Sequence, residues 1–255
     1  MKETTIITFK KIKMKNPVLI EGLPGIGLVG KIAADHLIKE RKAVKVATIY
    51  SPHFPHQVLM RKNGVLRMLR LKFYHAKAEK NDLLILVGDV QPLTSEAHYE
   101  LAGQILDYFH KCGGKHIITL GGYGTGERVG EPKVFGACTH KKLVPIYEKH
   151  GILFGKTRGS ILGAAGLLLG LGRLQGMHGV CLMGETHGGY VDPKSALCVL
   201  DTLGKILGTK FERVELEKKI KEGEKYVKRM EARAAKGVET GILPPPAKGD
   251  LSYIR

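Results

Sequence analysis

The sequence predicts an α/β fold: a three-layer sandwich with a mixed, mostly parallel sheet, an exposed β-hairpin, and a C-terminal helix followed by a flexible tail. Near-continuous apolar runs at 81–91, 116–126 and 178–190 alternate with segments of helical periodicity, which is typical of parallel strands buried on both faces. Asn63-Gly64 separates two runs of mixed apolar and basic residues and is a strong hairpin signal. The chain therefore combines a buried parallel part with an exposed antiparallel part.

The first half of the chain supplies an edge strand, an opening unit and the hairpin. Residues 3–9 alternate weakly, as an edge strand does. The stretch 16–38 joins an apolar run to a glycine-rich turn and then to a helix, which is the opening unit of an α/β fold. Residues 44–51 are rich in β-branched side chains and predict a second strand. Basic side chains on the outer face of the hairpin would protect it from edge pairing.

The second half predicts the remaining strands and helices. Thr94 or Ser95 can cap the helix after strand 81–91, and Gly113 can end it. Asp192-Pro193 begins a later helix, with proline near its first turn. The other predicted elements are short strands at 133–140 and 152–157, a helix near Pro145 and a buried, glycine-rich helix within 159–178.

The C-terminal part differs in composition from residues 1–210, which we expect to form the α/β domain. Residues 211–236 are charge-laced with a thin apolar stripe and predict an amphipathic helix. That helix either contacts another surface or another chain, or lies solvated on its own domain. Residues 237–255 include three consecutive prolines and predict an extended, flexible tail.

The formal net charge of +17 over 255 residues admits nucleic acid or acidic proteins as partners. The basic residues are dispersed, tryptophan is absent and no nucleic-acid-binding motif occurs, so we do not expect nucleic-acid binding. An acidic protein surface is at least as plausible a partner.

Cysteine usage and apolar runs point to a cytoplasmic protein without metal or membrane span. The four cysteines are far apart without a C-x-x-C pair, which argues against zinc and for a reduced compartment. His53 and His56 lack a third ligand and are interpreted as loop residues. The N-terminus has no signal-peptide core, and the longest apolar stretch, 161–171, is shorter than the roughly 20 residues of a membrane span.

A glycine motif follows the first buried strand. Gly25, Gly27 and Gly30 spell G-x-G-x-x-G, but the strand at 44–51 ends without the acidic residue that holds a ribose. Read as a P-loop, the motif reaches Lys31, but an isoleucine follows where Ser or Thr should meet Mg²⁺. We therefore favour a packing turn, in which the glycines allow the helix to approach the sheet closely.

Two further glycine loops, 121–127 and 184–190, also follow buried strands. The carboxyl ends of parallel strands are where α/β folds bind ligands, so the three loops are candidate ligand loops. Glu127, Glu185, Thr186 and His187 could line such a site together with the first loop. Since no Ser–His–Asp arrangement appears, no catalytic residue is predicted, and no cofactor is expected. A phosphate- or nucleoside-binding enzyme stays open as the alternative.

Four segments in order, NPVLIEGLPGIGLVGK, LLILVGDVQP, IITLGGYGTGE and MGETHGGYVDPKSA, resemble the archaeal proteasome assembly chaperone family over roughly residues 10–210. The resemblance implies an α/β sandwich similar to nucleoside phosphorylases, without an established enzymatic activity. It also implies a homo-oligomer and, in some members, binding to proteasome α-subunits. A non-enzymatic assembly chaperone, or a protein that binds a related family member, is the function expected.

The last residues resemble a proteasome-docking tail with one departure. Family members that engage the proteasome end in a hydrophobic residue, a tyrosine and any final residue. Here Tyr253, Ile254 and Arg255 end the chain, so the tyrosine comes one place early. The tail still offers an apolar pair, a basic side chain and a free carboxylate, and we predict that it docks between subunits. The alternative is an ordinary frayed terminus.

Overall fold

A computed structural model describes residues 1–78, 80–155, 159–214, 216–218 and 220–221. The chain divides into two units, Met1–Arg213 and Val214–Arg255, and the fold below is that of the first. The helix predicted over 211–236 lies mostly outside the described residues, and the tail predicted over 237–255 lies wholly outside them. Those two assignments stay predictions.

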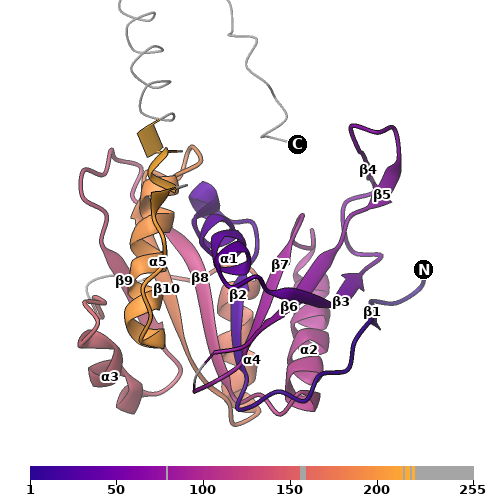
Figure 1. Ribbon diagram of the computed structural model, residues 1–255, viewed down its shortest axis with the longest axis horizontal. Helices are drawn as coiled ribbons and strands as arrows, with labels where there is room; N and C mark the ends of the chain where they lie inside the picture. The colour runs from indigo at the N-terminus through magenta and orange to yellow at the C-terminus, as the bar shows by residue number, and fades with distance from the viewer. Residues whose placement is uncertain (79, 156–158, 215, 219, 222–255) are drawn as a thin grey trace, which may run out of the picture. The chain divides into compact units, whose positions relative to one another are not determined.

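The first unit contains one eight-stranded mixed sheet (Figure 1), with strand order β1-β3-β6-β7-β2-β8-β10-β9. The central strands β7, β2, β8 and β10 are mutually parallel. In chain order the strands are β1 (Thr5–Thr8), β2 (Val18–Gly22), β3 (Val44–Tyr50), β6 (Leu71–Ala76), β7 (Leu83–Gly88), β8 (His116–Gly124), β9 (Val134–Cys138) and β10 (His178–Thr186).

Both flanks of the sheet are antiparallel, so the antiparallel share is larger than the one predicted. On one flank β1, β3 and β6 run antiparallel to their neighbours, and on the other β9 runs antiparallel to β10. The described residues that connect β3 to β6 and β6 to β7 contain no helix. Because neither connection contains a helical crossover, β6 runs antiparallel to β3, and β7 runs antiparallel to β6. The mixed sheet and the edge position of β1 confirm the prediction.

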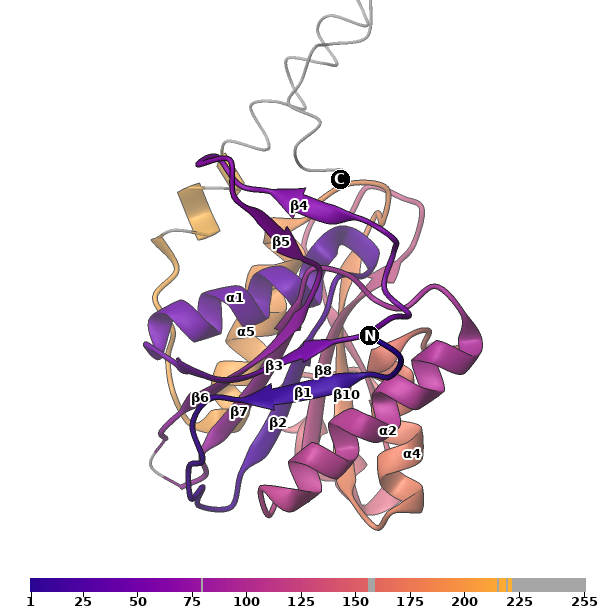
Figure 2. The ribbon, with the colours of Figure 1, turned by 90° about the vertical axis from the view of Figure 1, so that its right-hand side faces the viewer.

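Helices cover both faces of the sheet and give the predicted three layers. Figures 1 and 2 show α1 (Val29–Glu40) and α5 (Pro193–Leu207) on one face, with α2 (Ser95–Lys111) and α4 (Ala164–Leu174) on the other. The short η2 (Lys141–Leu143) and α3 (Val144–Glu148) follow β9. The Thr94 hydroxyl accepts a hydrogen bond from Ala97 N and caps α2, as the sequence predicted.

Two elements differ from their prediction. Residues 152–155 form no strand, because only an isolated bridge joins Leu153 to Phe135, and Gly155 then turns into the left-handed region. The glycine-rich helix α4 is not buried all round. Its Leu168 is fully buried against the sheet whereas Leu174 is exposed, so α4 is an ordinary surface-layer helix.

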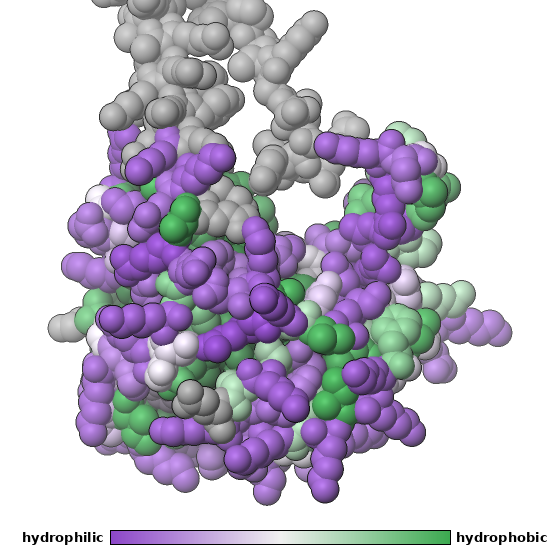
Figure 3. All heavy atoms as spheres, viewed as in Figure 1, coloured by the Kyte–Doolittle hydropathy of each residue, from purple (hydrophilic) through white to green (hydrophobic). Residues whose placement is uncertain are grey.

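The predicted hairpin exists, but it forms a separate two-stranded sheet of β4 (Val58–Met60) and β5 (Leu66–Met68). Its turn is a three-residue loop, because Arg61 N donates to Val65 O at 3.0 Å, and Gly64 adopts a φ of +76°. Figure 1 shows the hairpin projecting from the body. Figure 3 shows apolar residues gathered on the outer side of this projection.

The inner face of the hairpin is anchored to the body. Leu59 packs against the core, and the Arg67 guanidinium donates to both Asp89 carboxylate oxygens at 2.5 and 2.9 Å. Burial, the largest single effect, acts to raise the pKa of Asp89. The hydrogen bond and the charge of Arg67, together with the Arg70 N–H and the charge of Lys72, outweigh it and hold that pKa below its usual range. The Asp89–Arg67 pair therefore fixes the hairpin at its base.

Removing this anchor should loosen the hairpin. We expect Asp89→Ala to raise the rate at which trypsin cleaves after Arg61 and Lys62 about threefold or more, because local opening exposes the backbone. Limited proteolysis followed by mass spectrometry measures that rate. Asp35→Ala, which removes an ion pair on the surface of α1, is the matched control. Equal cleavage rates in all three proteins would show that the ion pair does not hold the hairpin.

Candidate functional site

Three glycine-containing loops meet at the carboxyl end of the parallel strands. They are the turn after β2, which contains η1 (Ile26–Leu28), the loop after β8 and the loop after β10. Backbone hydrogen bonds join them: Thr125 N donates to Thr186 O at 2.9 Å, and Asp192 N donates to Gly27 O at 2.9 Å. The structure thus brings together the loops that the sequence singled out.

A polar cluster holds the third loop, and the sequence predicted only Thr186 of its members as a site residue. The Thr186 hydroxyl donates to Asp192 Oδ2 at 2.7 Å, and Asp192 Oδ1 accepts from Ser195 N at 2.9 Å. Asp192 is the N-cap of α5, so its carboxylate satisfies an unpaired backbone donor of the helix. The Asp-Pro-x-Ser pattern at the helix start was the signal for this role. The Asp192 carboxylate is therefore engaged in the fold.

The glycines of the first loop mainly serve packing. A Cβ on Gly30 would lie 2.1 Å from Leu120 O of β8, closer than any real contact. Gly27 has a φ of +60°, and a Cβ there would lie 3.0 Å from Thr186 Oγ1. Gly22, which lies outside the motif, is equally constrained, since its Cβ would meet Gly30 O at 2.4 Å. Gly25 has open space around it and plays no such part.

Lys31 does not extend toward the loops as a P-loop lysine would. Its Nζ pairs with Asp35, one turn further along α1. Since that residue lies toward the C-terminus of the helix, the lysine side chain leans away from the glycine turn. A phosphate-binding interpretation of the motif therefore lacks a lysine directed at the phosphate, as well as the Ser or Thr hydroxyl that would meet Mg²⁺.

The other candidate residues bind local partners. Glu185 Oε2 accepts from Lys133 N at 3.3 Å, and His187 stacks on Tyr190 with ring centroids 5.0 Å apart. Glu127 is exposed, and its backbone N donates to the Thr125 hydroxyl. The side chains of Glu185 and His187 are therefore in contact with other protein groups, whereas the Glu127 side chain is exposed to solvent.

A buried carboxyl group on β2 was missed by the sequence reading. Glu21 is 1 % exposed; its Oε1 accepts from Leu23 N at 2.8 Å, and its Oε2 has no partner. Thr119 lies directly opposite on β8, and its hydroxyl is likewise unpartnered. Burial raises the pKa of Glu21 to about 8, although the Leu23 N–H acts to lower it. Glu21 is therefore protonated at neutral pH. The only indication of this buried carboxyl group in the sequence is a single glutamate within an apolar strand.

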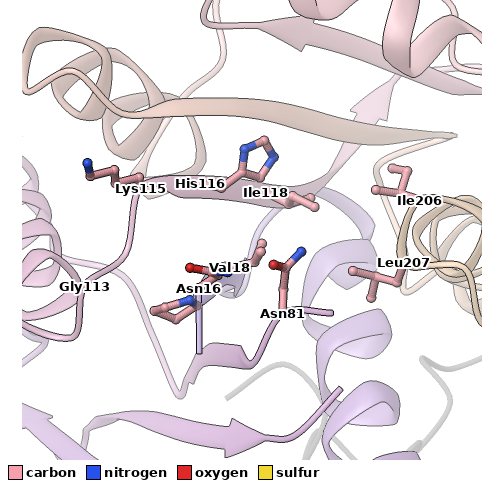
Figure 4. Close-up of a pocket in the computed structure, with 10 residues that line it drawn as sticks. Asn16, Val18, Asn81, Gly113, Lys115, His116, Ile118, Ile206 and Leu207 are labelled. Atoms are coloured by element: carbon pink, nitrogen blue, oxygen red, sulfur yellow. The ribbon is translucent and has the colours of Figure 1, made fainter. Parts of the chain in front are cut away.

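A cavity of about 580 Å³ lies at the opposite end of the strands (Figure 4). Its polar lining includes Asn16, Asn81, Lys115 and His116. His116 Nε2 bonds to Tyr147 Oη at 2.6 Å, and burial, with His178 nearby, lowers the pKa of His116. None of the predicted site residues lines this cavity.

The described residues contain neither a metal-binding cluster nor a membrane-spanning helix. No group of three or more His, Cys, Asp or Glu side chains is arranged to hold a metal ion in that part of the chain. Within the same part, none of the helices combines the length and apolar content that a membrane span requires.

The fold and its glycine-packed loops define a mixed α/β sandwich without the side chains of a nucleotide-binding loop. The chain belongs to the PAC2 family, whose sequence model matches residues 19–231. The family resemblance predicted from the sequence motifs is thereby confirmed.

Known relatives extend over nearly the whole chain. Pyrococcus furiosus PbaB, described as an archaeal proteasome activator, is 44% identical, with a TM-score of 0.87 over 91% of this chain and 100% of its own. Pyrococcus furiosus PbaA, described as an archaeal homolog of proteasome-assembly chaperone, is 29% identical, with a TM-score of 0.77 over 94% and 96% of the two chains. An uncharacterised protein of Methanocaldococcus jannaschii, MJ1210, is 38% identical over 98% of this chain and 97% of its own.

Proposed function

We propose that this chain is a non-enzymatic, proteasome assembly chaperone-like protein that acts in the cytoplasm as a homo-oligomer. It binds proteasome α-subunits, or a related assembly partner, through its body and its C-terminal tail. The observation that carries the proposal is the similarity to PbaB, a proteasome activator by description, over 91% of the chain. PbaA, a homolog of an assembly chaperone by its description, supports the same class of partner.

The proposed docking residues are Tyr253, Ile254 and Arg255, which lie outside the described residues. Their assignment rests on the sequence alone: three prolines at 244–246 precede an apolar pair and a basic terminal residue. An extended arm of this kind holds its end at a high local concentration near a partner that the body has already engaged. Tail and body thus act as two linked contacts.

The test measures binding of the full chain to recombinant archaeal proteasome α-subunits at low salt. Deleting residues 250–255 should weaken binding about tenfold or more, because one of two linked contacts is lost. Exchanging the order of two residues, Tyr253→Ile with Ile254→Tyr, restores a penultimate tyrosine and should bind at least as tightly as the natural chain. A full chain that forms no complex would contradict the proposal, and a deletion without effect would remove the tail from it.

The alternative function, a phosphate- or nucleoside-binding enzyme, draws support from the meeting of the three loops. The side-chain geometry favours the chaperone-like proposal instead. Gly30 makes a backbone-to-backbone contact with β8, Lys31 pairs with Asp35, and Asp192 caps a helix. These groups are occupied by the fold, so we place the function on protein surfaces.

A further inference from the structure

One face of the β4–β5 hairpin is apolar and exposed. Val58 pairs with Met68 and Met60 with Leu66, so all four side chains lie on the same side of the ribbon. Between 49% and 79% of each of these residues is exposed. We call Val58, Met60, Leu66 and Met68 the apolar hairpin face. The opposite face, with Leu59 and Arg67, is the one anchored to the body. A rigid base with an apolar outer face is typical of a protein contact.

Charge is divided unevenly between two neighbouring stretches of the chain. Residues 52–78, which contain the hairpin, carry six Lys or Arg residues and no Asp or Glu. Residues 81–110, which contain α2, carry five Asp or Glu residues and no Lys or Arg. Two of the five precede α2 and have partners within the chain, because Asp82 is buried beside His75 and Asp89 pairs with Arg67. The other three, Glu96, Glu100 and Asp107, lie on α2. On a chain with a net charge of +17, such an acidic stretch is an exception. The hairpin stretch and α2 therefore carry charges of opposite sign.

The start of α2 also offers exposed apolar surface. Glu96, Tyr99 and Glu100 share one side of the helix by their spacing, and Leu93 precedes the helix with 68% of its surface exposed. We call Leu93, Glu96, Tyr99 and Glu100 the acidic α2 face. Figure 2 shows the hairpin at the top of the molecule and α2 along one side of the sheet. The two surfaces therefore belong to different elements of one chain.

We propose that the apolar hairpin face of one copy docks on the acidic α2 face of a second copy. Apolar side chains would cover Leu93 and Tyr99, while Arg61 and Lys62 at the hairpin tip would meet the exposed Glu96. They would also meet the half-buried Glu100, whose Oε2 accepts from the Thr4 hydroxyl at 2.7 Å within the same chain. A hairpin-to-hairpin contact would instead bring like charges together, because the hairpin stretch carries no acidic residue. Two different surfaces in contact form a heterologous interface, which builds a closed ring or an open chain of copies.

This inference deepens the homo-oligomer part of the proposed function, and its test needs no proteasome. The mass of the full chain is measured by sedimentation equilibrium for the natural protein and for two variants. The hairpin variant is Met60→Asp with Leu66→Asp, and the α2 variant is Leu93→Lys with Glu96→Lys. Each should weaken self-association by about 100-fold or more, because apolar contacts are lost and like charges are introduced. Both should then sediment at the 28.0 kDa of one chain, whereas the natural protein sediments at a multiple of it.

Mixing the two variants gives the sharpest readout. The α2 variant keeps a natural hairpin and the hairpin variant keeps a natural α2 face, so an equimolar mixture has one intact contact. It should form a species of twice the chain mass. Leu174→Asp, at the exposed end of α4, is the control and should keep the natural mass. Thermal unfolding of every variant checks that the body stays folded.

Three results would overturn the inference. A natural chain that stays at 28.0 kDa would show that something other than a second copy covers the hairpin. A hairpin variant with the natural mass would place the contact elsewhere. Dissociation of the hairpin variant alone, with no pairing in the mixture, would indicate a hairpin-to-hairpin contact. None of these results bears on whether α-subunits bind, so the two proposals fail separately.

Discussion

Replacing Gly30 by alanine is expected to destabilise the fold by about 3 kcal/mol, at the upper end of what overpacking costs. The added methyl group would lie 2.1 Å from Leu120 O, a backbone atom that cannot rotate away. Helix α1 must therefore move off β8, and contacts of fully buried residues such as Val29 and Ala33 are lost. Urea unfolding of the two proteins measures the difference in free energy.

Gly25→Ala in the same motif is the matched control. Gly25 has an extended backbone with a φ of −159° and no neighbouring atom within 4 Å of an added Cβ. Its substitution should change stability by no more than about 0.5 kcal/mol. If both alanine variants lost stability equally, or neither did, the motif would not be a packing device.

Glu21→Gln should make the protein increasingly more stable than the natural chain as the pH rises. In the unfolded chain the carboxyl has its ordinary pKa of 4.5, whereas burial raises the folded-state pKa to about 8. Between these values the unfolded chain releases a proton that the folded chain keeps. The natural protein therefore loses about 1.4 kcal/mol per pH unit across that window. Glutamine does not titrate, and its side-chain oxygen can still accept from Leu23 N.

Chemical unfolding of both proteins at pH 5, 6, 7 and 8 checks this expectation. The difference in unfolding free energy should grow steadily over the series in favour of glutamine. Glu127→Gln, at an exposed position, should show a difference that does not change with pH. A constant difference for Glu21→Gln as well would mean that Glu21 is ionised in the folded chain.

The layered fold followed from local patterns because those patterns reflect burial on two faces. The run at 83–88 is fully buried as β7, and Thr94 caps α2 where the sequence placed a cap. Asp192-Pro193 likewise begins α5. Caps, apolar runs and helix periods depend on neighbours close in sequence, so they can be read without knowing the fold.

Other features depend on contacts between distant segments. Gly30 is constrained by the backbone of β8, Gly22 by α1, and Gly27 by Thr186 and its positive φ, whereas Gly25 has no such neighbour. Glu21 is buried because β2 lies at the centre of the sheet. The hairpin is fixed at its base because Arg67 pairs with Asp89, 22 residues away. No local pattern encodes these pairings.

The sequence predicted where the candidate site lies, but not what the side chains at that site do. Parallel strands place their following loops at one edge, which is why the three loops could be expected to meet. Whether the side chains there are free to bind a ligand depends on local partners such as Asp35 for Lys31. The i,i+4 spacing of Lys31 and Asp35 can be read from the sequence, whereas the contact of Glu185 with Lys133, 52 residues away, cannot.

The most direct test of the central claim is sedimentation velocity of the full chain mixed with archaeal proteasome α-subunits at low salt. The account predicts a new, faster-sedimenting species of fixed stoichiometry, which dissociates in part when residues 250–255 are deleted. Independent sedimentation of the chain and the α-subunits at every ratio, with the tail intact, would contradict it.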